Sequence, residues 1–362
     1  MKKLLVLLAL LTAAVPALSA EKTVAELNPD FVELMVQALR PKNEGAVFGY
    51  RNEVQPLSLF WFTDIHGDAE EFGRLIDFYN GYEKYFDGMI CTGDLVCDSA
   101  EGSDFTYWSK TPGHEKVMSV IGNHDVLRHH NDDANKNRKD ALSMAESYAR
   151  YFAPFIDKWG AVYESGKTYY YRDYPKSKVR FIVLDCMLRR SQDKEAVEGQ
   201  LRWFGECLTG ARVKGYTVAV AYHFPMWESV RFEDSNFNWR SEISNAWYSE
   251  LALFQAEVDR FKKKGGDFAL WLGGHTHCDY TNISPDYPDQ ICVCVCAATR
   301  FKCVVMTRQE GTKSQDIANA LIIDPDSGTF KVIRIGCDID TSGVVRRFMT
   351  VDYKTGKVLA RE

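Results

Sequence analysis

Five short polar clusters, each containing histidine, aspartate or both, constrain this chain more than any other feature. They are Thr63–Gly67, Thr92–Asp94, Gly122–Asp125, Tyr222–Pro225 and Gly273–His277. The clusters stand at or just past the ends of apolar, β-rich runs. In an α/β sheet, polar residues at the carboxyl ends of the strands gather at one edge, where ligands bind. We therefore expect a sheet that brings distant segments of the chain to one site.

Apolar runs alternate with amphipathic segments through most of the chain. Strands are predicted at 57–63, 88–92, 116–121, 179–185, 216–222 and 267–272, and helices at 70–79, 143–152, 198–208 and 243–264. Strands that alternate with helices imply an α/β fold in which the helices pack against a sheet.

The pattern changes near residue 290, after which strands follow one another with few helices between them. These strands are predicted at 291–297, 318–324, 330–335, 346–351 and 357–361. The turns at 324–328 and 353–356 are typical of hairpin connections. Residues 288–362 are therefore predicted to form a strand-rich segment that makes a second sheet, packed on the first within one domain.

The N-terminus has the pattern of a signal peptide. Two lysines precede an apolar run at residues 4–15, and small residues as far as Ala20 offer a cleavage site. The run is shorter than the roughly 20 apolar residues of a membrane span, although an uncleaved anchor is the alternative interpretation. Residues 1–20 are predicted to be removed, which leaves one domain over residues 21–362 with no stable membrane span. The protein is then expected to be secreted or periplasmic.

Charge argues against a nucleic-acid partner. Removal of the leader would take away two lysines and no acidic residue, so the formal net charge would change from -6 to -8. An acidic chain lacks the basic surface that attracts nucleic acids and anionic membranes. No nucleic-acid partner is therefore expected.

Ten cysteines in an exported protein raise the question of disulfides. Cys292, Cys294 and Cys296 alternate along a predicted strand and therefore share one face. Neighbours two apart on a strand are poorly placed to bridge each other. Three buried thiols, a structural zinc site, or bridges to Cys278, Cys303 or Cys337 are the alternatives.

The donors in the five clusters favour a site for two metal ions. Taken singly, each cluster has an ordinary explanation, because polar residues after strands are common in turns and a lone histidine such as His223 is usually packed or exposed. Five of the eight histidines, however, fall within the clusters. Carboxylate, imidazole and amide donors suit Mn, Fe, Zn or Co, whereas Ca²⁺ prefers all-oxygen cages. Two such ions about 3.5–4 Å apart can share a bridging carboxylate and a bridging hydroxide.

The order and spacing of the clusters resemble those of the calcineurin-like metallophosphoesterases. The pattern of that family is D-x-H, G-D, G-N-H-(D/E), H and G-H-x-H, and all five blocks occur between residues 64 and 277. The resemblance implies an α/β fold of two packed β-sheets flanked by helices, a four-layer sandwich. It also implies a phosphoric ester hydrolase with two divalent or trivalent transition metal ions.

The same resemblance implies a role for each residue. The implied metal ligands are Asp64, His66 and His277 for the first ion, Asn123, His223 and His275 for the second, and Asp94 as a bridge between them. A metal-bridging hydroxide would attack the phosphorus, and His124 would protonate the leaving group as a general acid. Asp125 would orient His124 or support a ligand. The glycines Gly93, Gly122 and Gly274 would let the backbone turn tightly beneath the metals.

Departures from known branches of the family narrow the interpretation. Plant-type purple acid phosphatases have a tyrosine three residues after the bridging aspartate, and here that position is Cys97. An iron-tyrosinate centre is therefore not expected. Too little chain follows His277 for the extra C-terminal domain of the 5′-nucleotidases, and the groove elements of the Ser/Thr protein phosphatases are not recognisable.

The leading hypothesis is a phosphomonoesterase or phosphodiesterase that acts on small extracytoplasmic phosphate esters. Loops at 224–247, which is rich in aromatic residues, and 127–138, which is rich in basic ones, are expected to set specificity. A diesterase for phospholipid or sphingomyelin-type substrates is one alternative, favoured if the first loop has an exposed apolar rim. A metal-containing binding protein without turnover is the other, and the intact ligands and His124 argue against it.

Overall fold

The computed structural model describes most of the chain. The described residues are 21–39, 54–97, 103–126, 142–188, 194–226, 245–277, 279–284, 286–295, 297–299, 308–336 and 348–361. The leader predicted at residues 1–20 lies outside them and stays a prediction. Within the described residues, no helix is long and apolar enough to cross a membrane.

Two seven-stranded mixed sheets form the centre of the fold. The first sheet has the order β14-β13-β12-β11-β1-β2-β3, in which β1, β2 and β3 are parallel and the others antiparallel. Its strands are β1 (Leu57–Phe62), β2 (Gly88–Cys91), β3 (Val117–Ser119), β11 (Ile317–Asp324), β12 (Thr329–Gly336), β13 (Phe348–Asp352) and β14 (Lys357–Arg361).

The second sheet has the order β4-β5-β6-β7-β8-β10-β9, with β6, β7, β8 and β10 parallel. Its strands are β4 (Val162–Tyr163), β5 (Tyr170–Tyr174), β6 (Val179–Val183), β7 (Thr217–Ala221), β8 (Asp267–Gly273), β9 (Tyr280–Ile283) and β10 (Ile291–Cys294).

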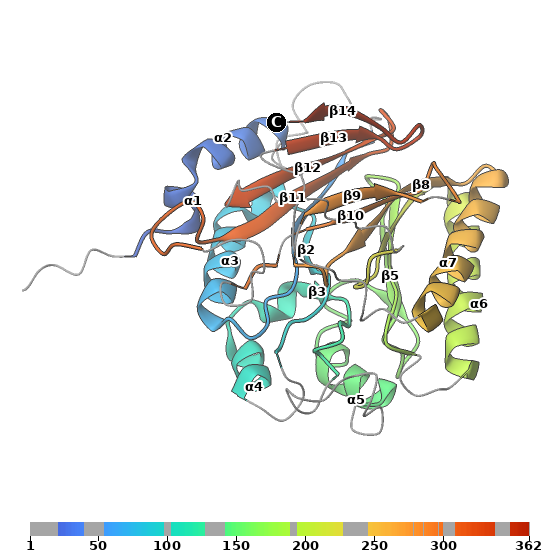
Figure 1. The fold of residues 1–362 in the computed structure, drawn as a ribbon, viewed down its shortest axis with the longest axis horizontal. Helices are drawn as coiled ribbons and strands as arrows, with labels where there is room; N and C mark the ends of the chain where they lie inside the picture. Colours follow the sequence, from blue (N-terminus) through green and yellow to red (C-terminus); the bar gives the residue numbers. More distant parts are fainter. Residues whose placement is uncertain are drawn as a thin grey trace, which may run out of the picture.

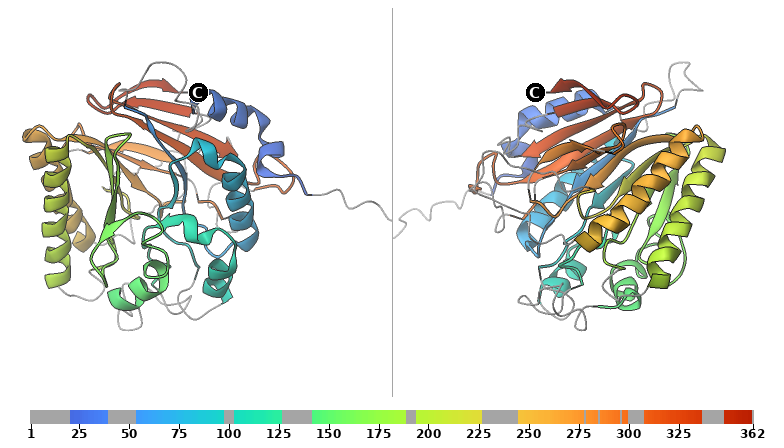
Figure 2. Two further views of the ribbon diagram at one scale, coloured as in Figure 1. Left: turned by 180° about the vertical axis from the view of Figure 1, so that it is seen from behind. Right: turned by 45° about the vertical axis from the view of Figure 1, so that its right-hand side comes forward.

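Helices cover the outer faces of the paired sheets, as Figure 1 shows. The covering helices are α1 (Val24–Leu27), α2 (Pro29–Ala38), α3 (Ala69–Tyr82), α6 (Lys194–Lys214) and α7 (Asn245–Lys263). Helices α4 (Ser103–Lys110) and α5 (Met144–Ser147) lie at the lower end of the view in Figure 1. Helices α6 and α7 lie side by side over the second sheet (Figure 2), and α1, α2 and α3 lie on the opposite side. The predicted α/β architecture of two packed sheets flanked by helices is therefore confirmed.

The division of the chain between the sheets differs from the prediction. Residues 288–362 do not form a second sheet of their own. Strand β11 pairs antiparallel with β1, with Leu57 opposite Ile323, so the C-terminal hairpins extend the sheet of β1, β2 and β3. Strand β10 pairs parallel with β8 and belongs to the other sheet. The strands themselves lie where they were predicted, but their partners are set by contacts far apart in the sequence.

A chain of buried hydrogen bonds connects the two sheets close to the polar clusters. All six residues of β1 are buried, as expected for a parallel strand covered on both faces. The indole N–H of Trp61 donates to the hydroxyl of Thr92 at 3.0 Å, and this hydroxyl donates to the carbonyl of Gly273 at 3.2 Å. Because Thr92 follows β2 and Gly273 ends β8, this chain of bonds fixes the ends of strands from both sheets relative to each other.

Two of the three alternating cysteines lie within the described residues. Cys292 and Cys294 are buried on β10. Cys296 and the suggested partners Cys278, Cys303 and Cys337 lie outside the described residues. The pairing of these cysteines therefore stays a prediction.

Candidate metal centre

The loops that carry the five clusters meet at the carboxyl ends of β1, β2, β3, β7 and β8. Backbone hydrogen bonds join them directly. The N–H of Asp64 donates to the carbonyl of Gly93 at 2.9 Å, and the N–H of His66 donates to the carbonyl of Asp94 at 3.0 Å. The N–H of Gly274 donates to the carbonyl of His223 at 2.9 Å. The polar side chains are thus held on loops that are bonded to one another.

One set of donor atoms comes from Asp64, His66, Asp94 and His277, all of which are buried. The Nε2 atoms of His66 and His277 lie 2.9 Å apart. Oδ1 of Asp64 lies 3.3 Å from Nε2 of His277, and Oδ2 of Asp94 lies 3.8 Å from Nε2 of His66. Two carboxylates and two imidazoles therefore converge on one point, as the ligands of a transition metal do.

A second set comprises Asp94, His223 and His275. Nε2 of His223 lies 3.3 Å from Oδ2 of Asp94 and 3.1 Å from Oδ1 of Asn123. The other ring nitrogen, Nδ1, lies 2.8 Å from the carbonyl oxygen of Thr92. A hydrogen bond there fixes the ring so that Nε2 points into the site, an arrangement common for metal-binding histidines.

Asp94 belongs to both sets. Its Oδ1 accepts a hydrogen bond of 2.8 Å from the backbone N–H of His124. Its Oδ2 is buried and has no hydrogen-bond partner among the described residues. A buried carboxylate oxygen without a partner is costly, and a cation bound at this oxygen would remove that cost.

The charges of the site suit a cation. Burial alone would raise the pKa of Asp64, but the hydrogen bond and charge of His277 hold it at about 2. Burial opposes ionisation of Asp94 as well, yet His223 and His124 keep the pKa of that carboxyl well below its usual value. Burial lowers the pKa of His66 well below its usual value and that of His275 to about 3. Ionised carboxylates and neutral imidazoles are the forms that bind metal. His223 differs, because burial would lower its pKa but the charge of Asp94 raises it to about 9, so this ring must release a proton when an ion binds.

The backbone is strained at these positions. Asp64, His66, Asp94, His275 and His277 all have φ between 47° and 67°, in the left-handed region. Non-glycine residues rarely adopt it, and each costs of order 1–3 kcal/mol. Strain concentrated at the convergent side chains indicates that the loops are shaped for a function that their stability alone would not require.

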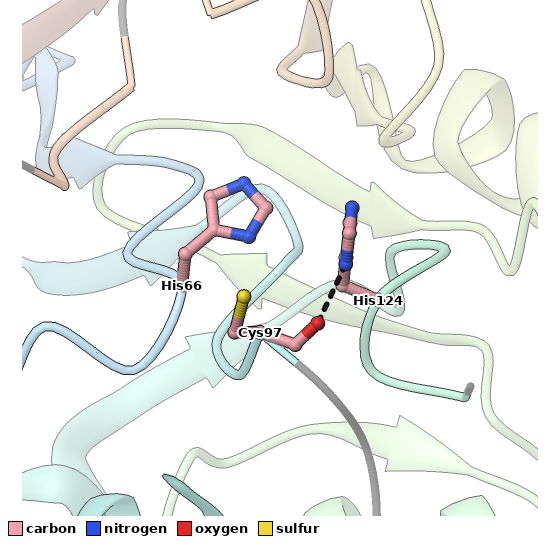
Figure 3. Close-up of side chains that lie close together, drawn as sticks. All are labelled: His66, Cys97 and His124. Atoms are coloured by element: carbon pink, nitrogen blue, oxygen red, sulfur yellow. Dashed lines mark hydrogen bonds between the residues drawn. The ribbon is translucent and has the colours of Figure 1, made fainter. Parts of the chain in front are cut away.

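Asp125 contacts the backbone of the loop that carries Asp94. These contacts do not fit the predicted role of orienting His124. Its carboxylate accepts hydrogen bonds of 2.8–3.2 Å from the backbone N–H groups of Asp94, Leu95, Val96 and Gly122. Burial and the charge of Asp94 nevertheless raise its pKa to about 7. Asp125 therefore holds the Asp94 loop against Gly122, whereas Nδ1 of His124 lies 2.6 Å from the carbonyl oxygen of Cys97 (Figure 3). Sequence reasoning missed this acceptor because a backbone carbonyl leaves no mark in the sequence.

Of the three glycines predicted to allow tight turns, Gly93 has a left-handed backbone, with φ of 110°. A Cβ there would also overlap Nδ1 of His223. Gly122 and Gly274 do not have a positive φ, and what excludes a side chain there is the closeness of Asp94 and Asp64. Glycine is therefore needed at these two positions because neighbouring atoms approach the backbone closely, and not because the turn requires a positive φ.

The loops predicted to set specificity fall mostly outside the described residues. Nothing is described between 127 and 141 or between 227 and 244. At the described start of the 224–247 loop, the ring of Phe224 packs edge-on against that of His275, with 4.5 Å between ring centroids. Phe224 therefore forms part of the wall beside the second donor set.

The fold and the convergent donor sets are those of an α/β protein with a candidate metal centre. Residues 57–279 match the family described as calcineurin-like phosphoesterase, and the chain belongs to that family. No protein of curated function matches the chain in sequence.

The chain is also similar to solved structures. A dimetal phosphatase from Danio rerio superposes with a TM-score of 0.50 at 11% identity, over 84% of this chain and 100% of that one. A predicted phosphoesterase from Streptococcus pneumoniae TIGR4 aligns at 12% identity, over 80% and 94% of the two chains, with a TM-score of 0.33. At 11% identity, the likeness to the Danio rerio structure concerns the fold alone.

Proposed function

We propose that this protein hydrolyses a phosphate ester with two metal ions held side by side at the convergent loops. The proposed ligands are Asp64, His66 and His277 for the first ion, Asn123, His223 and His275 for the second, and Asp94 for both. The family to which the chain belongs supports two ions, and the nitrogen and oxygen donors suit Mn, Fe, Zn or Co.

The observation that carries this proposal is the position of Asp94. Within the part of the chain that the structure describes, its buried Oδ2 has no hydrogen-bond partner. This oxygen lies 3.3 Å from Nε2 of His223 and 3.8 Å from Nε2 of His66. The oxygen thus lies between the two histidine sets. A carboxylate in that position fits a bridge between two cations better than a purely structural role.

The bound ions would supply a nucleophile at neutral pH by lowering the pKa of water, and would neutralise charge on the phosphate. His124 would donate a proton to the leaving oxygen. A hydrogen bond from Nδ1–H of His124 to the Cys97 carbonyl leaves Nε2 as the atom that delivers this proton. The amide of His124, bonded to Asp94, keeps the proposed acid at a fixed distance from the metal ligands.

We further propose that the protein works outside the cytoplasm, on the basis of the leader pattern at residues 1–20. Mass spectrometry of the N-terminus after expression in a host with a secretory pathway tests this proposal. Recovery of a chain that still begins at Met1 from the cytoplasm would contradict it.

Hydrolysis of p-nitrophenyl phosphate and bis-p-nitrophenyl phosphate, after reconstitution with Mn²⁺ or Zn²⁺, tests the function. We expect release from at least one ester, loss of release with chelator, and two ions per chain by elemental analysis after reconstitution with Mn²⁺. The ratio of the two rates distinguishes a monoesterase from a diesterase. Protein that holds two ions but hydrolyses neither these esters nor a panel of natural phosphate esters, phospholipids included, would contradict the proposal.

A further inference from the structure

A third group of donor atoms lies beside the proposed metal pair. Ligand atoms of His66, Cys97 and His124 all lie within 4.8 Å of one another. Figure 3 shows the Cys97 sulfur directed toward the His66 ring, with His124 standing next to both. Cys97 belongs to neither of the two donor sets that share Asp94. The thiol therefore adds a soft donor next to the site, on a side that the proposed ions do not use.

The two nitrogens of His66 face different surroundings. Nε2 lies 2.9 Å from Nε2 of His277 and belongs to the first donor set. Nδ1 is buried, has no hydrogen-bond partner among the residues that the structure describes, and is the ring nitrogen nearer the Cys97 sulfur (Figure 3). The residue is only 6% exposed. A buried nitrogen without a partner is rare in folded proteins and indicates that something binds it.

We propose that Nδ1 of His66, Sγ of Cys97 and a ring nitrogen of His124 form a separate site for a thiophilic cation of the Zn²⁺ type. One thiolate and two imidazoles are donors that Zn²⁺ binds tetrahedrally, with water in the fourth position. Binding would displace the thiol proton into solvent. When Nε2 of His66 also holds the first ion, the proton on Nδ1 of that ring would be displaced as well, and the ring would bridge the two cations as an imidazolate. Mg²⁺ and Mn²⁺ prefer oxygen donors, so the thiol selects against them. Cys97 is not fully buried, which gives a cation a route to the sulfur.

A cation bound here would inhibit the enzyme. It would occupy a nitrogen of His124, and a metal-bound nitrogen cannot hold the proton that the leaving group needs. Excess thiophilic metal should therefore slow turnover even when the metal pair is complete. This consequence rests on the proposed function, whereas binding of the third cation does not.

Titration of the metal-free protein with Co²⁺ tests the site, because Co²⁺ bound to thiolate shows a charge-transfer absorption that Co²⁺ bound to nitrogen and oxygen lacks. We expect three Co²⁺ per chain by equilibrium dialysis and a thiolate band that accompanies one of them. The Cys97→Ser variant should bind two and show no band. Cys207→Ser is the matched control, since Cys207 is a buried free thiol on α6, and it should bind three and keep the band.

Three outcomes would overturn the proposal: two Co²⁺ per chain without a band, two with a band, or a band that persists in Cys97→Ser. The second would place Cys97 among the ligands of the metal pair. For inhibition, the Zn²⁺ concentration that halves activity should rise at least about tenfold in Cys97→Ser, each variant being compared with its own activity without added Zn²⁺. If the protein hydrolyses no ester, the proposed function fails, but the Co²⁺ stoichiometry and absorption still decide this site.

Discussion

The backbone N–H of His124 donates a hydrogen bond of 2.8 Å to Oδ1 of Asp94. This bond occupies one carboxylate oxygen and leaves the other, the buried Oδ2, between the imidazoles of His66 and His223. The residue proposed to bridge the metals therefore also fixes the loop that carries the proposed acid. Binding of the ions and placement of the acid should depend on the same side chain.

The Asp94→Asn substitution tests whether the carboxylate of Asp94 bridges the two ions, because it removes the charge with little change in the shape of the side chain. The amide can still accept the hydrogen bond from His124, but it carries no charge for the two ions to share. We expect the metal content to fall from two ions per chain and kcat to fall at least about 100-fold, because even residues that only support ligands are worth 10–100-fold. Elemental analysis and ester hydrolysis measure both. Retention of two ions with full activity would exclude the bridging role.

His124→Gln should separate metal binding from proton transfer. The glutamine keeps a polar side chain and the backbone N–H bonded to Asp94, so both ions should remain. Loss of a general acid costs about 10²–10⁴ in rate. The loss should be greatest for alkyl esters, whose leaving groups need the proton, and least for p-nitrophenyl esters. A variant that loses its ions, or slows both ester types equally, would show that His124 is not the acid.

Much of the site was predictable because its residues occur in short local patterns that follow apolar runs. Asp64 and His66 come directly after β1, and His223 comes soon after β7. Burial of β1 on both faces produces the continuous apolar run that marks it in the sequence. The order of the clusters then indicated the family before any contact was known.

The rest depends on contacts that leave no local pattern. The pairing of Leu57 with Ile323 decides which sheet the C-terminal hairpins join, and these residues are far apart in the chain. The supports of the site are mainly backbone groups, such as the Cys97 carbonyl beside His124 and the four N–H groups around Asp125. Backbone groups are the same in every residue, so the sequence could not reveal them.

The metal-free protein should lose stability between pH 6.5 and 9. Burial would lower the pKa of His223, but the charge of Asp94 raises it to about 9, above its ordinary value of 6.5. The folded state then binds one proton more than the unfolded state in this window. The stabilisation is therefore complete below pH 6.5 and is lost as pH rises through 9, with a slope of at most about 1.4 kcal/mol per pH unit.

Urea denaturation in the presence of chelator, repeated across this pH range, measures the effect of His223. His223→Gln should abolish the slope, and saturation with metal should also abolish it, because the ions displace the proton. A slope that is equal in the wild type and in His223→Gln would assign the titration to another group.

Gly274→Ala tests how rigidly the loops of the two sheets fit together. A Cβ at this position would overlap Oγ1 of Thr63 and lie 2.7 Å from Oδ2 of Asp64. The hydroxyl of Thr63 donates to that same oxygen at 2.6 Å, so the new methyl group must displace the carboxylate. We expect a loss of about 1–3 kcal/mol in the free energy of unfolding, as for other overpacked sites, and weaker binding of the first ion.

Gly73→Ala is the control, because α3 leaves open space around Gly73 and alanine favours a helix by about 1 kcal/mol relative to glycine. If Gly274→Ala bound both ions as tightly as the wild type, the loops would have room to separate, and the close fit of Gly274 against Asp64 would not be what positions the carboxylate.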